Sequence, residues 1–133
     1  MTKALVCGGR DYQNRARVHQ ILDAAVERLG VDAVVQGGAT GADLLAKEWA
    51  IGRKLQCETF HADWRGLGVA AGPIRNKRML VEGKPDFVIA FPTPGEPNVG
   101  TNGMIKLARD AGLIVHVIDS SMNTTTAMGG EGR

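Results

Sequence analysis

Gln36-Gly37-Gly38-Ala39-Thr40-Gly41-Ala42-Asp43 joins an apolar run to a segment with helical periodicity. Residues 33–36 are typical of a buried strand, and apolar residues recur at helical spacing over residues 43–53. The glycine-dense stretch between them is therefore expected to be a strand-to-helix turn. Glycines allow backbone N–H groups to approach a ligand, and the positive end of the helix dipole favours an anion. The alternative is an ordinary tight connection capped by Thr40 or Asp43.

The rest of the chain repeats this alternation of strands and helices. Apolar runs predict five strands, at residues 3–7, 33–36, 55–60, 86–91 and 113–118. Helical periodicity predicts helices between them, over about residues 18–29, 43–53, 72–81 and 105–111, whereas residues 61–68 and 92–98 are expected to be loops. The fold class is therefore α/β, with a single doubly wound parallel sheet of about five strands and helices on both faces.

The strand at residues 3–7 is expected at the centre of this sheet. The strands at residues 33–36 and 55–60 would lie on one side of it, and those at residues 86–91 and 113–118 on the other. Ligands of such sheets bind at the carboxyl ends of the strands, beside the point where the chain reverses direction.

Composition narrows the functional classes. The chain has 133 residues, 44% hydrophobic and 23% charged, which is typical of one soluble globular domain. A net charge of +2 is too small to predict a nucleic-acid partner. No signal peptide and no apolar run of about 20 residues is found, so we expect a cytoplasmic protein without a membrane partner. Residues 120–133 lack periodicity and are expected to form a flexible C-terminal tail.

Neither cysteine nor histidine spacing indicates a metal centre. Cys7 and Cys57 belong to separate predicted strands, so we expect buried, reduced thiols. His19 and His116 are interpreted as structural, and no two histidines have metal-ligand spacing. We therefore predict no metal and no cofactor.

Three glycine-bearing turns are expected at the carboxyl edge of the sheet, at residues 8–11, 37–41 and 100–103. The second and third precede helices whose N-termini would point to one volume, which suits a ligand with phosphates or carboxylates. Neither of these two is a Walker A sequence, and residues 8–11 do not begin the Gly-x-Gly-x-x-Gly dinucleotide fingerprint.

Several polar side chains are expected around this volume: Arg10, Asp11, Asp63, Trp64, Arg65, Arg75 and Asn76. Arg75 is a candidate phosphate contact, whereas Arg78 is more typical of a solvated helix face. Asp63 and Trp64 are compatible with two interpretations. They would hold a ribose hydroxyl and stack on a base, or they are a capping aspartate beside a half-buried tryptophan.

The motifs resemble those of the SLOG superfamily, the Rossmann-like group that contains the Smf/DprA and LOG proteins, and most closely its YspA/YpsA-related branch of unknown function. The matching pieces are Val6 to Tyr12, Gly37 to Asp43, Ala62 to Trp64, Ala71 to Asn76, and Gly100-Thr101. The resemblance implies that residues 1–119 are a SLOG-like nucleotide-binding domain.

The resemblance does not imply the catalytic activity of LOG proteins, because the catalytic motif is incomplete in this chain. LOG members are phosphoribohydrolases that use an arginine and a glutamate, the latter in a Pro-Gly-Gly-x-Gly-Thr-x-x-Glu motif. This chain keeps Gly100-Thr101, but Met104 stands at the glutamate position and Asn98-Val99 replaces the doubled glycine. A thioether cannot stabilise an oxocarbenium-like centre or transfer a proton.

We therefore predict that the carboxyl edge binds a nucleotide or nucleotide-derived phosphorylated ligand, as in a sensor or carrier. The expected ligand contacts are Gly8, Gly9, Arg10, Gly37, Gly38, Ala39, Thr40, Gly41, Asp43, Trp64, Arg75, Asn76, Gly100, Thr101 and Asn102. One alternative is a hydrolase that uses Asp11, Asp63 or Glu96 to cleave an N-glycosidic or a phosphate bond of a nucleotide. A second is single-stranded DNA binding of the DprA type, although nucleic acid is not the expected partner. The resemblance also implies a homodimer or a higher homo-oligomer.

Overall fold

The computed structural model describes residues 1–119 of the chain, and the predicted tail at residues 120–133 lies outside the described residues. Its elements in chain order are β1 (Lys3–Gly8), α1 (Arg15–Leu29), β2 (Ala33–Gln36), α2 (Ala42–Gly52), β3 (Gln56–Thr59), α3 (Trp64–Leu67), the 3-10 helix η1 (Gly68–Ala70), α4 (Ala71–Val81), β4 (Phe87–Phe91), α5 (Val99–Asp110) and β5 (Val115–Val117). None of these helices is long and apolar enough to cross a membrane.

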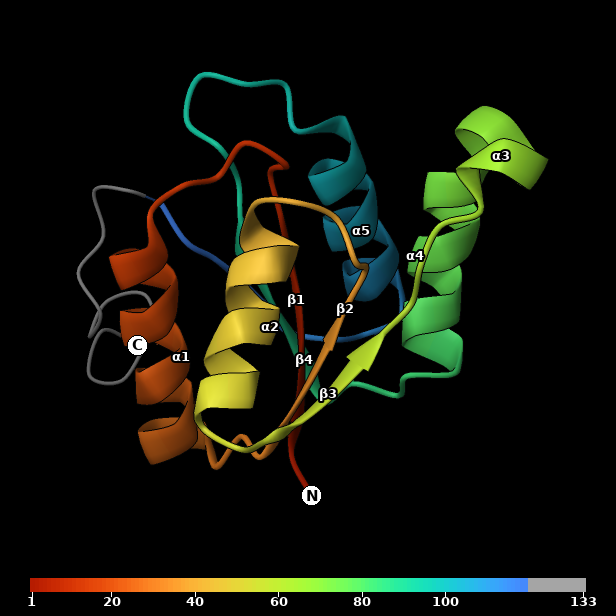
Figure 1. The fold of residues 1–133 in the computed structure, drawn as a ribbon. Coiled ribbons are helices and arrows are strands. Elements are labelled where there is room, and N and C mark those ends of the chain that lie inside the picture. Colours follow the sequence, from red (N-terminus) through yellow and green to blue (C-terminus); the bar gives the residue numbers. More distant parts are fainter. Residues whose placement is uncertain (120–133) are drawn as a thin grey trace.

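The five strands form one parallel sheet in the order β3-β2-β1-β4-β5. The predicted α/β class and the predicted strand order are thus confirmed. Helices α1 and α2 cover one face of the sheet, and α4 and α5 cover the other (Figure 1). The chain reverses direction between β1 and β4, so the loops that follow these two strands lie side by side at the carboxyl edge.

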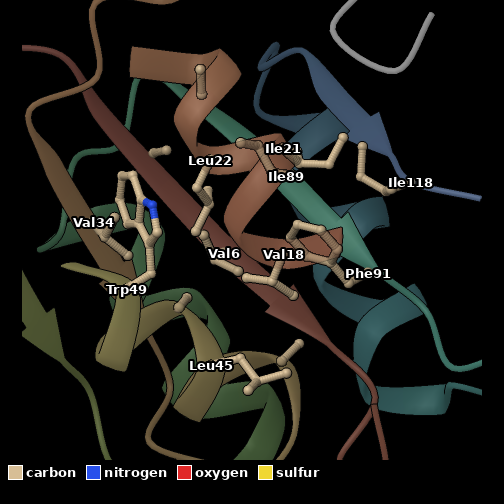
Figure 2. Close-up of a cluster of buried hydrophobic side chains, with 14 of the residues drawn as sticks. Val6, Val18, Ile21, Leu22, Val34, Leu45, Trp49, Ile89, Phe91 and Ile118 are labelled. Carbon is tan, nitrogen blue, oxygen red and sulfur yellow. The ribbon is translucent and has the colours of Figure 1, made fainter. Parts of the chain in front are cut away.

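The core follows the two-residue alternation of the strands. In β1, Val6 packs toward α1 and α2, while Leu5 and Cys7 pack toward α4 and α5. Figure 2 shows the first of these layers, where Trp49 of α2 and Ile89 of β4 lie among the aliphatic side chains of α1. Because both faces are covered, the central strands are apolar at nearly every position.

Two sequence expectations about local structure are corrected. Residues 61–68 are not all loop, because Asp63 caps the short helix α3 by accepting a hydrogen bond from the N–H of Gly66 at 2.9 Å. Residues 100–103 are not a turn before a helix, because α5 already begins at Val99. Short helices and helix starts lack the periodicity by which longer elements are recognised.

Most of the remaining local expectations agree with the structure. Gly30 ends α1 in the left-handed conformation, with φ of 71°. Cys7 and Cys57 are both free thiols, but only Cys7 is buried as expected, whereas Cys57 is partly exposed. Trp49 is 3% exposed and belongs to the core, as its position on the apolar face of its helix predicted.

We predict that truncating the buried Ile89 to alanine lowers the free energy of unfolding by about 2–5 kcal/mol, because it leaves a cavity between the sheet and α1. Urea titration followed by circular dichroism measures this change. The matched control is Ile51→Ala on α2, where the side chain is 62% exposed and the expected change is within about 0.5 kcal/mol. Equal effects of the two substitutions would contradict the assignment of the core.

Candidate ligand-binding site

A cavity of about 710 Å³ lies at the carboxyl edge, beside the reversal between β1 and β4. This volume is within the range of sites that hold small molecules and cofactors. Its walls come from the loops after β1, β2 and β4 and from α3, η1, α4 and α5. The lining residues are Cys7, Gly8, Gly9, Arg10, Asp11, Ala39, Asp43, Trp64, Val69, Gly72, Pro73, Arg75, Asn76, Met79, Thr93, Glu96, Pro97, Asn98, Val99, Gly100, Thr101, Gly103, Met104 and Leu107.

A smaller cavity of about 300 Å³ adjoins the first. Its walls come from the glycine-dense turn before α2 and from the segment before α3. Four of its lining residues also line the larger cavity. The lining residues are Gly37, Gly38, Thr40, His61 and Ala62, together with the shared Arg10, Ala39, Trp64 and Arg75.

The glycines of the first two turns allow one loop to pack against the other. A Cβ atom at Gly41 would overlap the carbonyl group of Gly9, and φ of Gly41 is 74°. The N–H of Ala42 donates to the same carbonyl oxygen at 3.2 Å. Gly8 is likewise enclosed, between the carbonyl of Phe91 and the side chain of Ala42. These glycines therefore serve the contact between loops, where the sequence suggested the approach of a ligand.

Several N–H groups of the glycine-dense turn are also used within the protein. Gly38 donates to Oε1 of Gln36 at 2.6 Å, and Ala39 donates to Oδ2 of Asp43 at 3.2 Å. Together with the bond from Ala42, three N–H groups at this turn are unavailable to an anion. A phosphate at this turn would therefore have to use other donors than these three N–H groups.

The N-terminus of α5 is open by comparison. Asn98 precedes the helix, but its side chain bonds to Thr93 and Glu96 and does not cap the helix. The N–H groups of the first turn have no partner within an α-helix, and Val99, Gly100 and Thr101 line the larger cavity. The positive end of the α5 dipole therefore faces the cavity.

Thr101 adds a hydroxyl group at this helix end. Its side chain is only 5% exposed, yet it forms no hydrogen bond with any residue in the range 1–119. Because the residue lines the larger cavity, its hydroxyl group is available to form a hydrogen bond there.

Arg75 connects the two cavities. Its Nη1 donates to the carbonyl oxygen of Gly37, and its Nε donates to Oδ1 of Asn76 at 3.0 Å. Asn76 in turn donates to the carbonyl oxygen of Gly100 at 3.5 Å. A Cβ atom at Gly37 would overlap the guanidinium group, so a side chain there would displace Arg75 from this position. Burial lowers the pKa of Arg75, although nearby Asp43 opposes this effect, and a guanidinium group stays protonated.

Arg10 and Trp64 form the mouth shared by both cavities. The Arg10 guanidinium lies 4.8 Å from the centre of the indole ring, in a cation–π contact, and has no hydrogen-bond acceptor within residues 1–119. Trp64 is 47% exposed. An exposed aromatic ring stacked with a free cation offers a surface for a nucleobase or an anion.

Asp43 is the most perturbed acid of the site. Its side chain is buried, and this burial raises the pKa to about 6, even though the N–H of Ala39 and the guanidinium of Arg75 act in the opposite direction. Perturbed carboxyl groups in clefts are frequent at functional sites. Cys7, at the floor of the cavity, has its pKa raised by burial, so it remains a protonated thiol and a poor nucleophile.

The structure separates the other sequence candidates. Asp11 and Glu96 line the larger cavity, whereas Asp63 caps α3 and lines neither cavity. Two further residues of the predicted contact set also line neither cavity: Gly41 packs on Gly9, and Asn102 donates to the carbonyl of Pro97. Arg65 lines neither, and Arg78 pairs with Glu82 on the exposed side of α4.

Sequence reasoning missed the apolar wall of the larger cavity and the histidine of the smaller one. Met79 and Leu107 lie on helical faces whose spacing is that of ordinary core residues, so nothing in the pattern distinguishes them. His61 follows a strand in an expected loop, and its position beside Gly38 becomes visible only in three dimensions.

The Asp43 carboxyl group is predicted to destabilise the fold in a pH-dependent way. It titrates near 3.8 when exposed and near 6 in the folded chain, so the folded protein binds more protons between these values. Stability is therefore lost as the pH rises through this window. The free energy of unfolding of Asp43→Asn is expected to exceed that of the wild type by about 1–3 kcal/mol at pH 8 and by much less near pH 4.

Urea titrations of both proteins at several pH values measure this difference. The matched control is Asp11→Asn, an exposed acid of the same cavity, for which we expect a change within about 0.5 kcal/mol. A gain for Asp43→Asn that does not vary with pH would contradict the assignment.

Comparisons with known proteins support the fold and identify the family of this chain. DNA processing protein A (DprA) from Streptococcus pneumoniae has a similar structure, with a TM-score of 0.70 at 17% identity. The similarity covers 99% of this chain but only 57% of the DprA chain, so this chain spans little more than half of that protein.

The sequence matches are more specific. The Gene 61 protein of Mycobacterium phage D29 is 35% identical over 121 residues, which cover 86% of this chain and 94% of that protein. The sequence model of the YspA, cpYpsA-related SLOG family matches residues 2–66, a range that contains the first two glycine turns and Trp64. The chain belongs to the YspA, cpYpsA-related SLOG family.

Proposed function

We propose that the larger cavity binds a nucleotide or a nucleotide-derived phosphorylated ligand. The observation that carries this proposal is the uncapped N-terminus of α5 inside a cavity that also contains Arg75 and Thr101, whose hydroxyl has no hydrogen-bond partner within residues 1–119. A phosphate group supplies acceptors for the hydroxyl, for the first-turn N–H groups and for the guanidinium. The phosphate site is thus centred on α5, with the glycine-dense turn beside it.

The remaining walls suit a nucleoside. Met79, Met104 and Leu107 offer an apolar surface from α4 and α5, and Trp64 offers an aromatic ring at the mouth. Asp43 offers a carboxylate, which accepts hydrogen bonds from ribose hydroxyls. A site with an apolar wall and a few convergent polar groups is the usual form of a small-molecule pocket.

We predict that the wild-type chain binds at least one of AMP, GMP, CMP and UMP, and that two substitutions weaken this binding. Thr101→Val preserves the volume of the side chain and removes the hydroxyl, with an expected loss of about five- to tenfold. Arg75→Ala removes a charged donor, and the expected loss is about tenfold or more. Isothermal titration calorimetry measures both affinities.

The matched control is Arg78→Ala, three residues farther along α4, where the guanidinium pairs with Glu82 and lines neither cavity. Its affinity is expected to equal that of the wild type. Failure of the wild type to bind any of the four nucleotides would overturn the proposal. Binding to single-stranded oligonucleotides that strengthens steeply at low salt, without mononucleotide binding, would favour the DNA-binding alternative.

A hydrolytic role of the same cavity is the second candidate, and the buried Asp43 with its raised pKa favours it. In such a reaction the Asp43 carboxylate accepts a proton from water, the water oxygen bonds to the ribose C1′, and the C1′–N bond breaks. The proton accepted by Asp43 is then transferred to the leaving base, so that one water molecule is consumed and the carboxylate is restored.

We predict for this candidate that the wild type releases free base from the nucleotide it binds and that Asp43→Asn does not. Chromatography of the reaction mixture measures the released base, and calorimetry measures whether the variant still binds. Base release that survives in Asp43→Asn would remove Asp43 from the reaction, and binding without base release in the wild type would favour a sensor or carrier.

A further inference from the structure

We propose that the smaller cavity is a second anion subsite, so that the ligand is a nucleoside diphosphate whose two adjacent phosphates occupy the two cavities. This inference rests on the proposed function, because the larger cavity must hold the nucleoside and its first phosphate. It concerns a property that the larger cavity alone does not determine, namely the number of phosphates.

The two cavities differ in charge. The larger is lined by three carboxyl groups, of Asp11, Asp43 and Glu96, in addition to its two arginines. No acidic residue is among those that line the smaller cavity within residues 1–119, whereas two guanidinium groups and the imidazole of His61 are. The smaller cavity therefore suits a phosphate group, which needs only hydrogen-bond donors. It does not suit a ribose, whose hydroxyl groups would be bound by a carboxylate.

The basic side chains of the smaller cavity have hydrogen-bond donors without a partner in residues 1–119. The guanidinium of Arg10 contacts only the ring of Trp64, and His61 forms no hydrogen bond or ion pair within residues 1–119. Arg75 uses two of its nitrogens, Nη1 and Nε, which leaves Nη2 without an acceptor in that range. Three residues thus have unused donors at one small opening.

Arg75 makes the two anion positions adjacent. One nitrogen bonds to the carbonyl of Gly37 in the wall of the smaller cavity, and another connects through Asn76 to the carbonyl of Gly100 in the wall of the larger one. Two phosphates bound on either side of one guanidinium group are close neighbours. A diphosphate has this spacing, whereas phosphates at opposite ends of a ribose are held apart.

Size decides which end of the ligand enters. The smaller cavity has a volume of about 300 Å³, less than half of the 710 Å³ of the larger one, and lacks the apolar wall formed by α4 and α5. A second nucleoside therefore does not match it, whereas a terminal phosphate does.

The test compares three ligands of one nucleoside by calorimetry in the presence of EDTA. The probes are the 5′-monophosphate with the highest affinity among the four common ribonucleotides, the corresponding 5′-diphosphate, and the corresponding 3′,5′-bisphosphate. We expect the diphosphate to bind about tenfold more tightly than the monophosphate. The bisphosphate has as many phosphates but not adjacent ones, so we expect it to gain less than about threefold.

Two variants assign the gain to the smaller cavity. His61→Ala is expected to reduce the preference for the diphosphate to about two- or threefold while the monophosphate affinity stays the same, and His61→Gln, which retains a donor, is expected to keep part of it. Thr101→Val is the control, because it weakens both ligands equally and leaves their ratio unchanged.

Three results would overturn the second subsite: equal affinities of mono- and diphosphate, an equal gain with the bisphosphate, or an unchanged preference in His61→Ala. In each of these the monophosphate still binds, so the proposed function stands. If neither the mono- nor the diphosphate binds, both proposals fail together.

Discussion

The backbone contact between the first two glycine turns is the constraint on which the site depends. The N–H of Ala42 at the start of α2 donates to the carbonyl of Gly9. The two loops lie so close together at Gly41 that a Cβ atom there would overlap the carbonyl of Gly9. This contact ties the end of β1 to the start of α2 at the reversal of the sheet. Arg10, the residue after Gly9, is thereby held beside the turn before α2, where both cavities meet.

Close packing of the turns leaves the site with a concentrated set of charges. Asp43 accepts a hydrogen bond from the N–H of Ala39 in the glycine-dense turn and is buried near Arg75. Burial disfavours its charged form, which is why its pKa is raised. A buried acid that weakens the fold is unusual in a purely structural position. The hydroxyl of Thr101 and the guanidinium of Arg10 are further polar groups that have no hydrogen-bond partner within residues 1–119, and like Asp43 they line the larger cavity.

The features that could be predicted from the sequence are those that leave a local pattern in it. Strands β1, β2 and β4 were recognisable because their burial on both faces makes them continuous apolar runs. The position of Arg75 near the carboxyl edge followed from its place in the first turns of α4. Helix α3 was missed because four residues carry no period, and Asn102 was misplaced because the start of α5 was expected too late.

Local patterns along the chain were enough to predict the alternation of strands and helices, the order of the strands and the edge of the sheet where the cavities lie. These depend on periodicity and on the general rules of parallel sheets. Only the tertiary structure decided that the glycines face one another across the loops, that α5 has the open end, and that His61 joins Arg10 and Arg75 at a second cavity. The reason is that these contacts join residues distant in sequence, and hydrogen bonding between loops leaves no signal in the residues of either loop alone.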